Sequence, residues 1–324
     1  MPTNHLPLPQ RALVTGSAGF IGSHLAQSLL ANGATVIGVD RRDRDEPIAA
    51  TNLGQLLSHP AYHHVTADLR TCAIEPLLVG TDTVFHLAGI PGVRPSWGTA
   101  FGDYTESNLL AAHRLLTAVT HLRIPRVVVA SSSSVYGPTD GSPSFEGDCP
   151  SPASPYAVTK LAEEQLCLAH ASRPGSPTTV VALRYFTVFG PRQRSDMFIH
   201  RALHAASTDT PLRLYGSGRQ QRDFTYIDDA VTATIAAASP QVPSTVINVG
   251  GGATASLLDV IHLSQELTGQ PIKLDPHTTR NGDVPVTRAD LDRATQFLDY
   301  RPSVDLATGM RHQLAALNSP LITT

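Results

Sequence analysis

Short apolar runs alternate with longer segments of helical periodicity through the first two-thirds of the chain. The runs are rich in Val, Ile and Leu, which favours buried strands, whereas apolar residues spaced three and four apart favour helices. The predicted strands are 12–15, 35–39, 62–66, 83–87, 127–131 and 179–183. The predicted helices are 20–32, 104–121 and one that begins near Ser154 and Pro155, since proline is favoured at the first helical position. Strands alternating with helices require right-handed crossovers, so the pattern predicts an α/β fold with a doubly wound parallel sheet.

The alternation becomes irregular after about residue 186. The segment 189–222 is rich in Gly, Pro and Arg, and a helix is predicted within it at 197–206. A strand at 246–249 and helices at 257–268 and 289–298 are predicted beyond it. We expect residues 1–186 to form the sheet domain, with some later segments returning to it, and residues 187–324 to form mainly a smaller C-terminal substrate-binding lobe. Such a lobe closes over the carboxyl edge of the sheet, where doubly wound folds bind ligands.

The composition excludes several classes of protein. The 324 residues carry 24 basic and 27 acidic side chains, a net charge of −3, which argues against a polybasic face for nucleic acid or a membrane surface. With 41% hydrophobic and 16% charged residues, the chain is neither disordered nor fibrous. No apolar run approaches the roughly 18 residues of a spanning helix, and residues 1–10 lack the pattern of a signal peptide. Cys72, Cys149 and Cys167 are odd in number and scattered, so we expect a soluble protein of the reducing cytoplasm.

A glycine-rich turn joins the first predicted strand to its helix. It reads Gly16-Ser17-Ala18-Gly19-Phe20-Ile21-Gly22, and such a turn brings backbone N–H groups close to a pyrophosphate at the helix N-terminus. Asp40 ends the second strand, where a carboxylate accepts the ribose hydroxyls of NAD and repels the extra phosphate of NADP. A glycine turn alone also suits an ordinary strand–helix connection, and Arg41 and Arg42 leave NADP as an alternative. The turn and Asp40 together predict a Rossmann-type NAD site.

Only two of the 24 basic residues are lysines, Lys160 and Lys273. Tyr156 lies four residues before Lys160 on a predicted helix, hence on the same face. A free tyrosine has a pKa of about 10, so a phenolate base at neutral pH needs nearby positive charge, which Lys160 and an oxidised nicotinamide both supply. The serines 131–134 follow the fifth strand at the edge that faces the cofactor. Alone, the Tyr–Lys pair suits a surface helix and the serines suit a turn; behind a dinucleotide turn they predict a catalytic group.

The chain resembles the extended short-chain dehydrogenases/reductases, specifically the nucleotide-sugar epimerase/dehydratase group, over nearly its whole length. The motifs that carry the resemblance are GxxGFIG (16–22), HLAG (86–89), SSSSVYG (131–137), YxxxK (156–160), RYFTVFGPRQR (184–194), RDFTYIDD (222–229) and RNGDV (280–284). The resemblance implies hydride chemistry at C4 of a nucleotide-sugar. It makes Tyr156 the base, places Lys160 on the nicotinamide ribose, and matches Ser132 to the third catalytic residue.

The resemblance also places further candidate residues. In it, Asp68 and Leu69 lie beside the adenine, Asn108 near the active site, Arg222 and Arg280 on phosphate, and Asp283 near the uridine ribose. The candidate cofactor residues are Gly16, Gly19, Phe20, Ile21, Gly22, Asp40, Arg41, Asp68, Leu69, Leu87, Ala88, Gly89, Asn108, Tyr156 and Lys160. The candidate substrate residues are Arg94, Ser132, Ser133, Ser134, Thr187, Arg194, Arg222, Arg280 and Asp283.

Departures from the family motifs discriminate among its reactions. Ser133 and Ser134 stand where the 4,6-dehydratases carry an Asp-Glu acid/base pair, and Ser134 stands where uronate decarboxylases carry Glu. The remaining reaction is epimerisation, in which C4 is oxidised, the ketone rotates, and the hydride returns to the opposite face. Thr187 replaces the Asn of UDP-galactose-type epimerases, and the run from Thr187 to Arg194 resembles UDP-glucuronate 4-epimerases. That resemblance implies that Thr187, Arg194 and the serines hold a C6 carboxylate; the alternatives for Arg194 are a pyrophosphate contact or a surface charge.

The leading hypothesis is therefore an NAD-dependent UDP-glucuronate 4-epimerase. A UDP-glucose/UDP-galactose 4-epimerase, a reductase that consumes NADPH and a non-catalytic NAD(H)-sensing module are the alternatives. His200 and His204 have the helical spacing of zinc ligands, but Arg201 stands where the HExxH motif requires Glu, so no metal site is predicted. Asp228 and Asp229 precede an Ala-rich helix and are interpreted as helix N-caps. Family members often dimerise through the helices that correspond to 104–121 and 155–172, which implies a homodimer.

Overall fold

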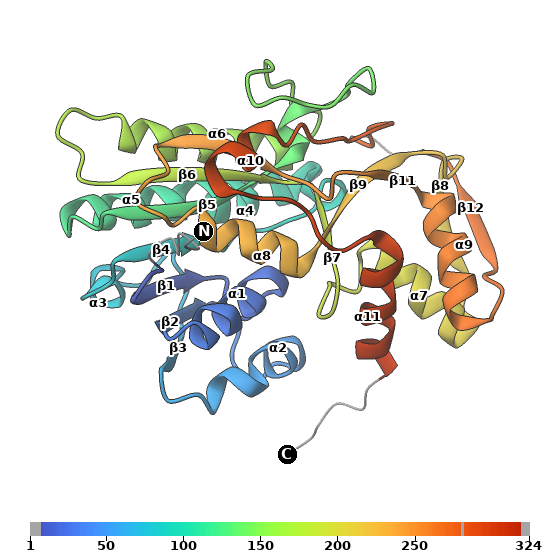
Figure 1. The fold of residues 1–324 in the computed structure, drawn as a ribbon, viewed down its shortest axis with the longest axis horizontal. Helices are drawn as coiled ribbons and strands as arrows, with labels where there is room; N and C mark the ends of the chain where they lie inside the picture. The colour runs from blue at the N-terminus through green and yellow to red at the C-terminus, as the bar shows by residue number, and fades with distance from the viewer. Residues whose placement is uncertain (1–7, 280–281, 319–324) are drawn as a thin grey trace, which may run out of the picture.

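A seven-stranded parallel sheet forms the centre of the protein in a computed structural model that describes residues 8–279 and 282–318 (Figure 1). The strands lie in the order β10-β6-β5-β4-β1-β2-β3, and every neighbouring pair is parallel. They are β1 (Arg11–Thr15), β2 (Thr35–Asp40), β3 (Tyr62–Thr66), β4 (Thr83–His86), β5 (Arg126–Ser132), β6 (Thr179–Tyr185) and β10 (Thr245–Val249). The doubly wound sheet and all six strands predicted in the first part of the chain are confirmed. The strand order reverses between β1 and β4, which is where folds of this kind bind ligands.

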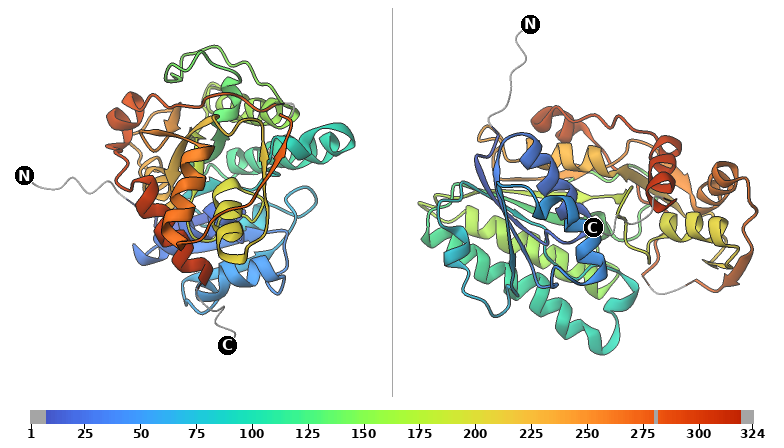
Figure 2. Two further views of the ribbon diagram at one scale, coloured as in Figure 1. Left: turned by 90° about the vertical axis from the view of Figure 1, so that its right-hand side faces the viewer. Right: turned by 90° about the horizontal axis from the view of Figure 1, so that it is seen from below.

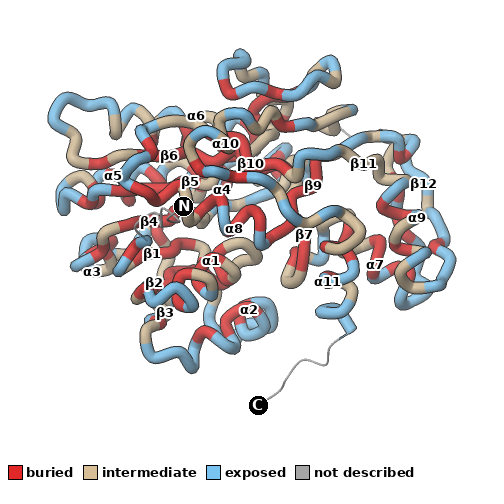
Figure 3. Tube along the Cα trace, in the orientation of Figure 1, coloured by how far each residue is buried: buried red, intermediate tan, exposed pale blue. Residues whose placement is uncertain are grey.

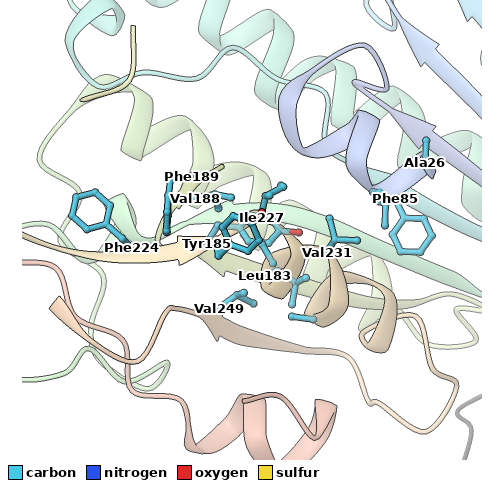
Figure 4. Packing of buried hydrophobic residues seen from close by; sticks show 14 of the residues in the cluster. Ala26, Phe85, Leu183, Tyr185, Val188, Phe189, Phe224, Ile227, Val231 and Val249 are labelled. Carbon is cyan, nitrogen blue, oxygen red and sulfur yellow. The ribbon is translucent and has the colours of Figure 1, made fainter. Parts of the chain in front are cut away.

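Helices cover both faces of this sheet (Figure 1). One face carries α1 (Phe20–Ala31), α2 (Pro47–Leu57) and α8 (Ile227–Ala236), and the other carries α3 (Glu75–Leu78), α5 (Ala111–His121) and α6 (Pro155–Ala171). Alternate strand residues point to opposite faces, so β1 contributes Val14 to one core and Leu13 to the other. Figure 4 shows the first core, where Leu183 of the sheet lies near Ile227 of α8.

The elements that follow β6 build most of a second, smaller part beside the carboxyl ends of the strands (Figure 2). One small sheet has the order β11-β9-β7, and a second pairs β12 with β8. The elements are β7 (Thr187–Phe189), α7 (Phe198–Thr208), β8 (Leu212–Tyr215), β9 (Gln221–Tyr226), β11 (Thr254–Ser256), α9 (Leu257–Thr268), β12 (Leu274–His277), α10 (Asp292–Leu298) and α11 (Leu306–Asn318). Two later elements belong to the central sheet instead: α8 packs on its face, and β10 pairs with β6 at its edge. The division at residue 186 stays a prediction.

The segment 104–121 differs from the single α-helix that was predicted. It comprises the end of α4 (Phe101–Tyr104), a π-helical stretch η3 (Thr105–Leu110) and then α5. Within η3 the side chain of Asn108 accepts a hydrogen bond from the Ile90 N–H at 2.7 Å and donates to the Ile90 carbonyl at 3.2 Å. π-Helical turns occur often at functional sites. Here the turn lets Asn108 fix the loop that follows β4.

The predicted helix at 289–298 is wrong at its start, because α10 begins only at Asp292. The backbone N–H groups of Ala289 and Asp290, just before this helix, bind other segments of the chain. The Ala289 N–H donates to the Asp223 carboxylate at 3.1 Å, and the Asp290 N–H donates to the Ser144 carbonyl at 2.9 Å. These bonds hold the segment extended against the rest of the protein.

The interpretation of Asp228 and Asp229 as N-caps is also wrong. The N-cap of α8 is Tyr226, and both aspartates lie inside the first helical turn, where a carboxylate is favoured by the helix dipole. Asp229 accepts hydrogen bonds at 3.1 Å from the backbone N–H groups of Ser303 and Val304. It therefore ties the C-terminal segment to α8.

Buried positions concentrate along the strands and on the helix faces that meet them (Figure 3), whereas residues 41–46, between β2 and α2, are largely exposed. Helix α2 was not predicted, because the apolar positions Ile48 and Leu57 at its two ends face solvent and blur the periodicity. Within the described ranges, no helix has both the length and the apolar character needed to cross a membrane.

Candidate active site

A cleft of about 770 Å³ runs along the carboxyl ends of the central strands and continues between them and the smaller part. Its size is typical of ligand-binding clefts. The predicted site residues that line it are Gly16, Gly19, Phe20, Ile21, Gly22, Asp40, Arg41, Asp68, Leu69, Leu87, Ala88, Gly89, Arg94, Ser132, Ser133, Ser134, Tyr156, Lys160, Thr187, Arg194, Arg222 and Asp283. Asn108 is fully buried and supports the Ile90 loop, so it is not among the lining residues. Arg280 lies outside the described residues.

The glycine turn forms a cradle with no side chain over it. A Cβ atom on Gly22 would lie 2.1 Å from the Gly16 carbonyl oxygen, and one on Gly16 would lie 3.0 Å from the Ala88 backbone nitrogen. Gly16 also has φ of +71°, which favours glycine. Helix α1 begins here without a side-chain cap and without an acidic residue in its first turn. Its first N–H groups are therefore open to an anion, which fits the pyrophosphate of a dinucleotide.

Two of the predicted cofactor residues, Asp40 and Asp68, are carboxylates that line the cleft. The side chain of Asp40, at the end of β2, accepts hydrogen bonds from the backbone N–H groups of Ala18 at 3.1 Å and Arg42 at 3.0 Å. Asp68 accepts from the Arg70 guanidinium at 2.7 to 3.1 Å, and this hydrogen bonding holds the pKa of Asp68 below its usual value. Both carboxylates are thus held in position, where they can accept hydrogen bonds from ribose hydroxyls. Arg70 was missed in the sequence, although it stands two residues after a predicted site residue.

Beneath the glycine turn, Thr15 and His86 organise the loop that contains Leu87 and Ala88. The Thr15 hydroxyl accepts hydrogen bonds from the N–H groups of Leu87 and Ala88, both at 3.1 Å, and lies 2.8 Å from His86 Nδ1. Burial lowers the pKa of His86 to about 3, and the nearby Lys160 acts in the same direction. The imidazole is therefore neutral.

Helix α6 presents Tyr156 and Lys160 to the cleft. Its N-terminus follows the predicted pattern, since Pro155 is at the first position and the Ser154 hydroxyl accepts a hydrogen bond from the Ala157 N–H at 3.1 Å. Desolvation lowers the pKa of Lys160, but the charges of Glu163 and Tyr156 outweigh it and leave that pKa raised. The ammonium consequently stays charged beside the phenol, which is the arrangement that favours a phenolate.

The four serines of the run all line the cleft, but their hydrogen-bond partners differ. The Ser132 hydroxyl accepts hydrogen bonds from the N–H of Ser134 at 3.2 Å and from the Ser134 hydroxyl at 2.9 Å, so its own proton is available to a ligand. Ser131 is buried and donates to Glu164 at 2.6 Å. Residues 133–136 form a short 3₁₀ turn, η4, that keeps Ser133 and Ser134 at the cleft.

Tyr104 supports the ring of Tyr156, a contact that the sequence did not suggest. The two rings meet edge to face with centroids 6.2 Å apart. The Tyr104 hydroxyl donates to the carbonyl oxygens of Pro91 and Gly92 at 3.1 and 3.0 Å, which anchors the ring. The position of Tyr156 is therefore fixed by a buried neighbour as well as by its helix.

Thr187, the first residue of β7, lines the cleft together with Arg194. The Arg194 guanidinium donates from Nε and Nη2 to the two oxygens of Asp196, both at 2.8 Å. This hydrogen bonding lowers the pKa of Asp196. The arginine fork thus already binds a carboxylate in the free protein, and Arg194 is the residue to which the resemblance assigns a sugar carboxylate.

An arginine cluster lines part of the cleft. It consists of Arg94, Arg201, Arg213 and Arg222, and only Arg94 and Arg222 were predicted. Arg94 donates to Asp283 at 3.1 Å and its guanidinium lies 4.4 Å from the centre of the Tyr215 ring. Burial lowers the pKa of Arg222 and of Arg201, and both also face the positive charge of Arg94. Such a cluster is suited to an anionic ligand such as a diphosphate. In a chain with so many arginines, Arg201 and Arg213 gave no sequence signal.

His200 and His204 do not converge on a common point. Their rings stack with centroids 6.4 Å apart, and the Nδ1 of His204 lies 3.3 Å from the Thr208 hydroxyl. Across residues 8–279 and 282–318, no three His, Cys, Asp or Glu side chains form a group that could hold a metal ion.

The chain is similar to several known proteins over almost its full length. It is 41% identical over 313 residues to "Uncharacterized UDP-glucose epimerase YtcB" of Bacillus subtilis, covering 95% of this chain and 98% of that protein. MoeE5, whose structures contain NAD with either UDP-glucuronic acid or UDP-glucose, is 42% identical, with a TM-score of 0.88 and coverage of 95% and 98%. The UDP-glucuronic acid 4-epimerase of Bacillus cereus, in complex with UDP-glucuronic acid and NAD, is 38% identical, with a TM-score of 0.90 and the same coverage.

The family assignment agrees with the geometry of the cleft. The model of the NAD dependent epimerase/dehydratase family matches residues 12–250, which include the glycine turn, the serine run and the Tyr156–Lys160 pair. The open N-terminus of α1 and the fixed Asp40 are the features that a bound NAD requires. The chain belongs to the NAD-dependent epimerase/dehydratase family.

Proposed function

We propose that this protein is an NAD-dependent UDP-sugar 4-epimerase that interconverts UDP-glucuronate and UDP-galacturonate. The observation that carries the proposal is the lining of one cleft, which joins Tyr156 and Lys160 to Thr187 and Arg194. The glycine turn and the arginine cluster line this same cleft. One cleft therefore offers groups suited to a dinucleotide and to a nucleotide-sugar, and it also contains Tyr156 and Lys160.

The chain's own residues supply the proton chemistry. NAD, when bound, supplies the acceptor for the C4 hydride and later its donor. The Tyr156 phenolate takes the proton of the C4 hydroxyl, Lys160 stabilises that phenolate, and the Ser132 hydroxyl donates to the same sugar oxygen. After the 4-keto sugar has rotated, Tyr156 returns the proton to the C4 oxygen. The proton and the hydride are both returned, so no cofactor is consumed.

The serine hydroxyls argue against a dehydratase. Elimination of water from a sugar needs a proton donor and an acceptor of moderate pKa. Ser133 and Ser134 line the cleft at the places where that pair stands in dehydratases, and a serine hydroxyl is too weak an acid and too weak a base for either task at neutral pH. They can, however, donate hydrogen bonds to a carboxylate.

Control of the sugar carboxylate is chemically important for a uronate. A 4-keto uronate is a β-keto acid, and it loses CO2 when its C5–C6 bond is aligned with the ketone π system. We propose that Arg194, with Thr187 and the serines, binds the carboxylate and keeps that bond near the ring plane. A planar guanidinium suits this task because it can bind both carboxylate oxygens at once.

The proposal is tested by incubating the purified protein, without added cofactor, with UDP-glucuronate or with UDP-glucose and resolving the products by chromatography. We expect UDP-galacturonate from the first substrate, no pentose product and no net change in NADH absorbance. Conversion of UDP-glucose alone would overturn the uronate assignment. Stoichiometric consumption of NADPH would instead identify a reductase.

Replacement of Arg194 by alanine is expected to affect the two sugars differently. Loss of a charge-assisted hydrogen bond costs about 1.5–3 kcal/mol, so kcat/KM for UDP-glucuronate should fall by about one to two orders of magnitude. The value for UDP-glucose should change little, because that sugar has no carboxylate. The matched control is Arg222→Ala, which should weaken both substrates equally through their shared diphosphate. Equal losses in the Arg194 variant would contradict the carboxylate assignment.

A UDP-glucose/UDP-galactose 4-epimerase is the second candidate. It is favoured by the ion pair between Arg194 and Asp196, which occupies two guanidinium donors in the free protein. The name of the B. subtilis relative and the UDP-glucose complex of MoeE5 point in the same direction. The two-substrate assay separates the candidates.

We further propose that the protein is a homodimer. Leu110 at the end of η3 is 52% exposed, and Val158 on α6 is 46% exposed. The elements η3 and α6 pack against each other, and they belong to the two helices through which the family resemblance implies dimerisation. Pairing of these helices between two copies would bury both side chains. Analytical ultracentrifugation is expected to give twice the chain mass of 34.5 kDa, and Val158→Glu should give the monomer mass. A monomeric wild type would contradict the proposal.

We also propose a cytoplasmic location. Cys72, Cys149 and Cys167 are all free, as expected in a reducing compartment. Fractionation of the source cells with an antibody to the protein tests this.

A further inference from the structure

Glu163 is a buried carboxylate next to the Tyr–Lys pair that no step of the proposed reaction uses. Its side chain is 1% exposed. Oε2 accepts a hydrogen bond from Lys160 Nζ at 2.5 Å, one helical turn away on α6. Oε1 has no hydrogen-bond partner among the described residues, and the Nε2 of His86 lies 3.6 Å from it. Burial of a carboxylate with one unpaired oxygen destabilises the folded protein unless neighbouring charges stabilise the anion.

The hydrogen bonds of Thr15 determine which nitrogen of His86 faces Glu163. The Thr15 hydroxyl already accepts two backbone hydrogen bonds, so its own proton goes to His86 Nδ1. Since the imidazole is neutral, its ring proton is on Nε2, and it points toward Glu163 Oε1. Glu163 therefore lies between an ammonium and an N–H dipole, both of which favour its anion.

The remaining groups around Glu163 oppose ionisation. Burial raises the pKa of Glu163 to about 7, the Lys160 charge opposes this rise, and the neighbouring Glu164 adds to it. Cys167, one turn further along α6, is also buried, and burial raises the pKa of its thiol. Lys160, Glu164 and Cys167 on α6 and His86 on β4 are the titratable groups that face this site.

We propose that Glu163 is a positioning residue and the buried counter-ion of Lys160, and that its charge sets how strongly the ammonium acts on Tyr156. The inference rests on the proposed role of Tyr156 as the acid/base group, but its test does not require turnover. The ion pair places the ammonium on the Tyr156 face of α6 by means of a short contact. It also neutralises part of the positive charge that would otherwise promote the phenolate.

The two possible roles of Glu163 predict opposite effects. With an ionised Glu163, loss of the Tyr156 proton leaves the Tyr156–Lys160–Glu163 group, of which Lys160 and Glu163 are buried, with a net charge of −1. With a neutral residue at position 163, the same loss leaves a neutral Tyr–Lys pair, which is far less costly in a buried site. Removal of the charge should therefore let the phenolate form at lower pH. If Glu163 only held Lys160 in place, its removal would loosen the ammonium and the phenolate would form at higher pH.

The test is an ultraviolet titration of tyrosinate in the cofactor-free protein. Because the chain has eight tyrosines, each titration is subtracted from that of the same protein carrying Tyr156→Phe. We expect Glu163→Gln, which keeps the shape of the side chain, to shift the Tyr156 transition downward by about one pH unit or more. No shift, or a shift upward, would overturn the proposal.

Two further variants make the result unambiguous. Glu146→Gln is the matched control, because it removes a buried carboxylate that accepts a hydrogen bond from the Asn248 N–H and is not bonded to Lys160. It should leave the Tyr156 transition in place; an equal shift there would overturn the assignment to Glu163. If Glu163→Gln fails to fold, Glu163→Met is expected to give the same downward shift.

The activity assay then separates this inference from the proposed function. If the protein converts UDP-sugars, the acidic limb of kcat against pH should move to lower pH in Glu163→Gln, in the same direction as the titration. If the titration shifts but Tyr156→Phe retains turnover, the proposed catalytic role is wrong while the counter-ion role of Glu163 stands. If Tyr156→Phe is inactive and no titration shift occurs, only the role of Glu163 is wrong.

Discussion

Tyr156→Phe is expected to lower turnover of the UDP-sugar by about two to four orders of magnitude, the contribution typical of a positioned general acid/base. Phenylalanine retains the ring that meets Tyr104 edge to face, so the fold around the site should be unchanged. NAD affinity should be largely retained, because the glycine turn and Asp40 do not depend on the phenol. Single-turnover kinetics and a fluorescence titration with NAD measure the two quantities separately.

The control for this substitution removes a phenolic hydroxyl elsewhere. Tyr300 lies outside the cleft lining and donates to the Gly250 carbonyl at 2.7 Å. Tyr300→Phe should cost about 1 kcal/mol of unfolding free energy and leave turnover unchanged. If Tyr156→Phe turns over as fast as the Tyr300 variant, Tyr156 is not the acid/base group.

Glu164→Gln is expected to give the largest loss of stability, about 3–5 kcal/mol in the free energy of unfolding. The Glu164 carboxylate accepts hydrogen bonds from the Arg184 guanidinium at 2.6 and 2.9 Å, and both side chains are almost fully buried. The substitution leaves a buried guanidinium without its counter-ion. Chemical denaturation followed by tyrosine fluorescence and circular dichroism measures the change.

Two comparisons locate the cause of that loss. Lys273 forms an ion pair with Asp209 at 2.7 Å, but the two side chains are 64% and 70% exposed. Lys273→Gln should therefore change stability by no more than about 1 kcal/mol. A double replacement of Glu164 and Arg184 by methionine should recover much of the stability, because it removes both charges together. A loss in Glu164→Gln as small as that in the Lys273 variant would show that the buried pair contributes little.

The sheet could be predicted from the sequence because each of its first six strands carries its own signal. Val127 to Val129 is an unbroken β-branched run, and such a run is buried wherever it pairs. The glycine turn, Asp40 and the Tyr156–Lys160 spacing are likewise local patterns, and their occurrence together in this order indicates a dinucleotide site with a catalytic pair. The cleft residues found in this way are those whose role is fixed by their distance from a strand end.

The other parts of the site depend on contacts between distant segments, which leave no local pattern. Tyr104 reaches Tyr156 across 52 positions, and Arg94 reaches Asp283 across 189. Arg201 and Arg213 become a pair only when α7 lies beside β8, where Arg201 donates to the Arg213 carbonyl. Glu163 was the exception, because a carboxylate three residues after a lysine on a helix is a recognisable ion-pair spacing. It was overlooked because the spacing alone does not show that the pair is buried.

The seventh strand, β10, has a consequence for the order in which the protein can form during synthesis. Its residues 245–249 pair with β6 from Val181 to Tyr185, so about three-quarters of the chain must leave the ribosome before that edge is covered. Until then the growing chain presents a bare row of backbone N–H and C=O groups beside an apolar strand, a known route to aggregation. A fragment that ends at residue 186 keeps that edge permanently exposed. The segment 245–249 is thus needed for the solubility of the first 186 residues.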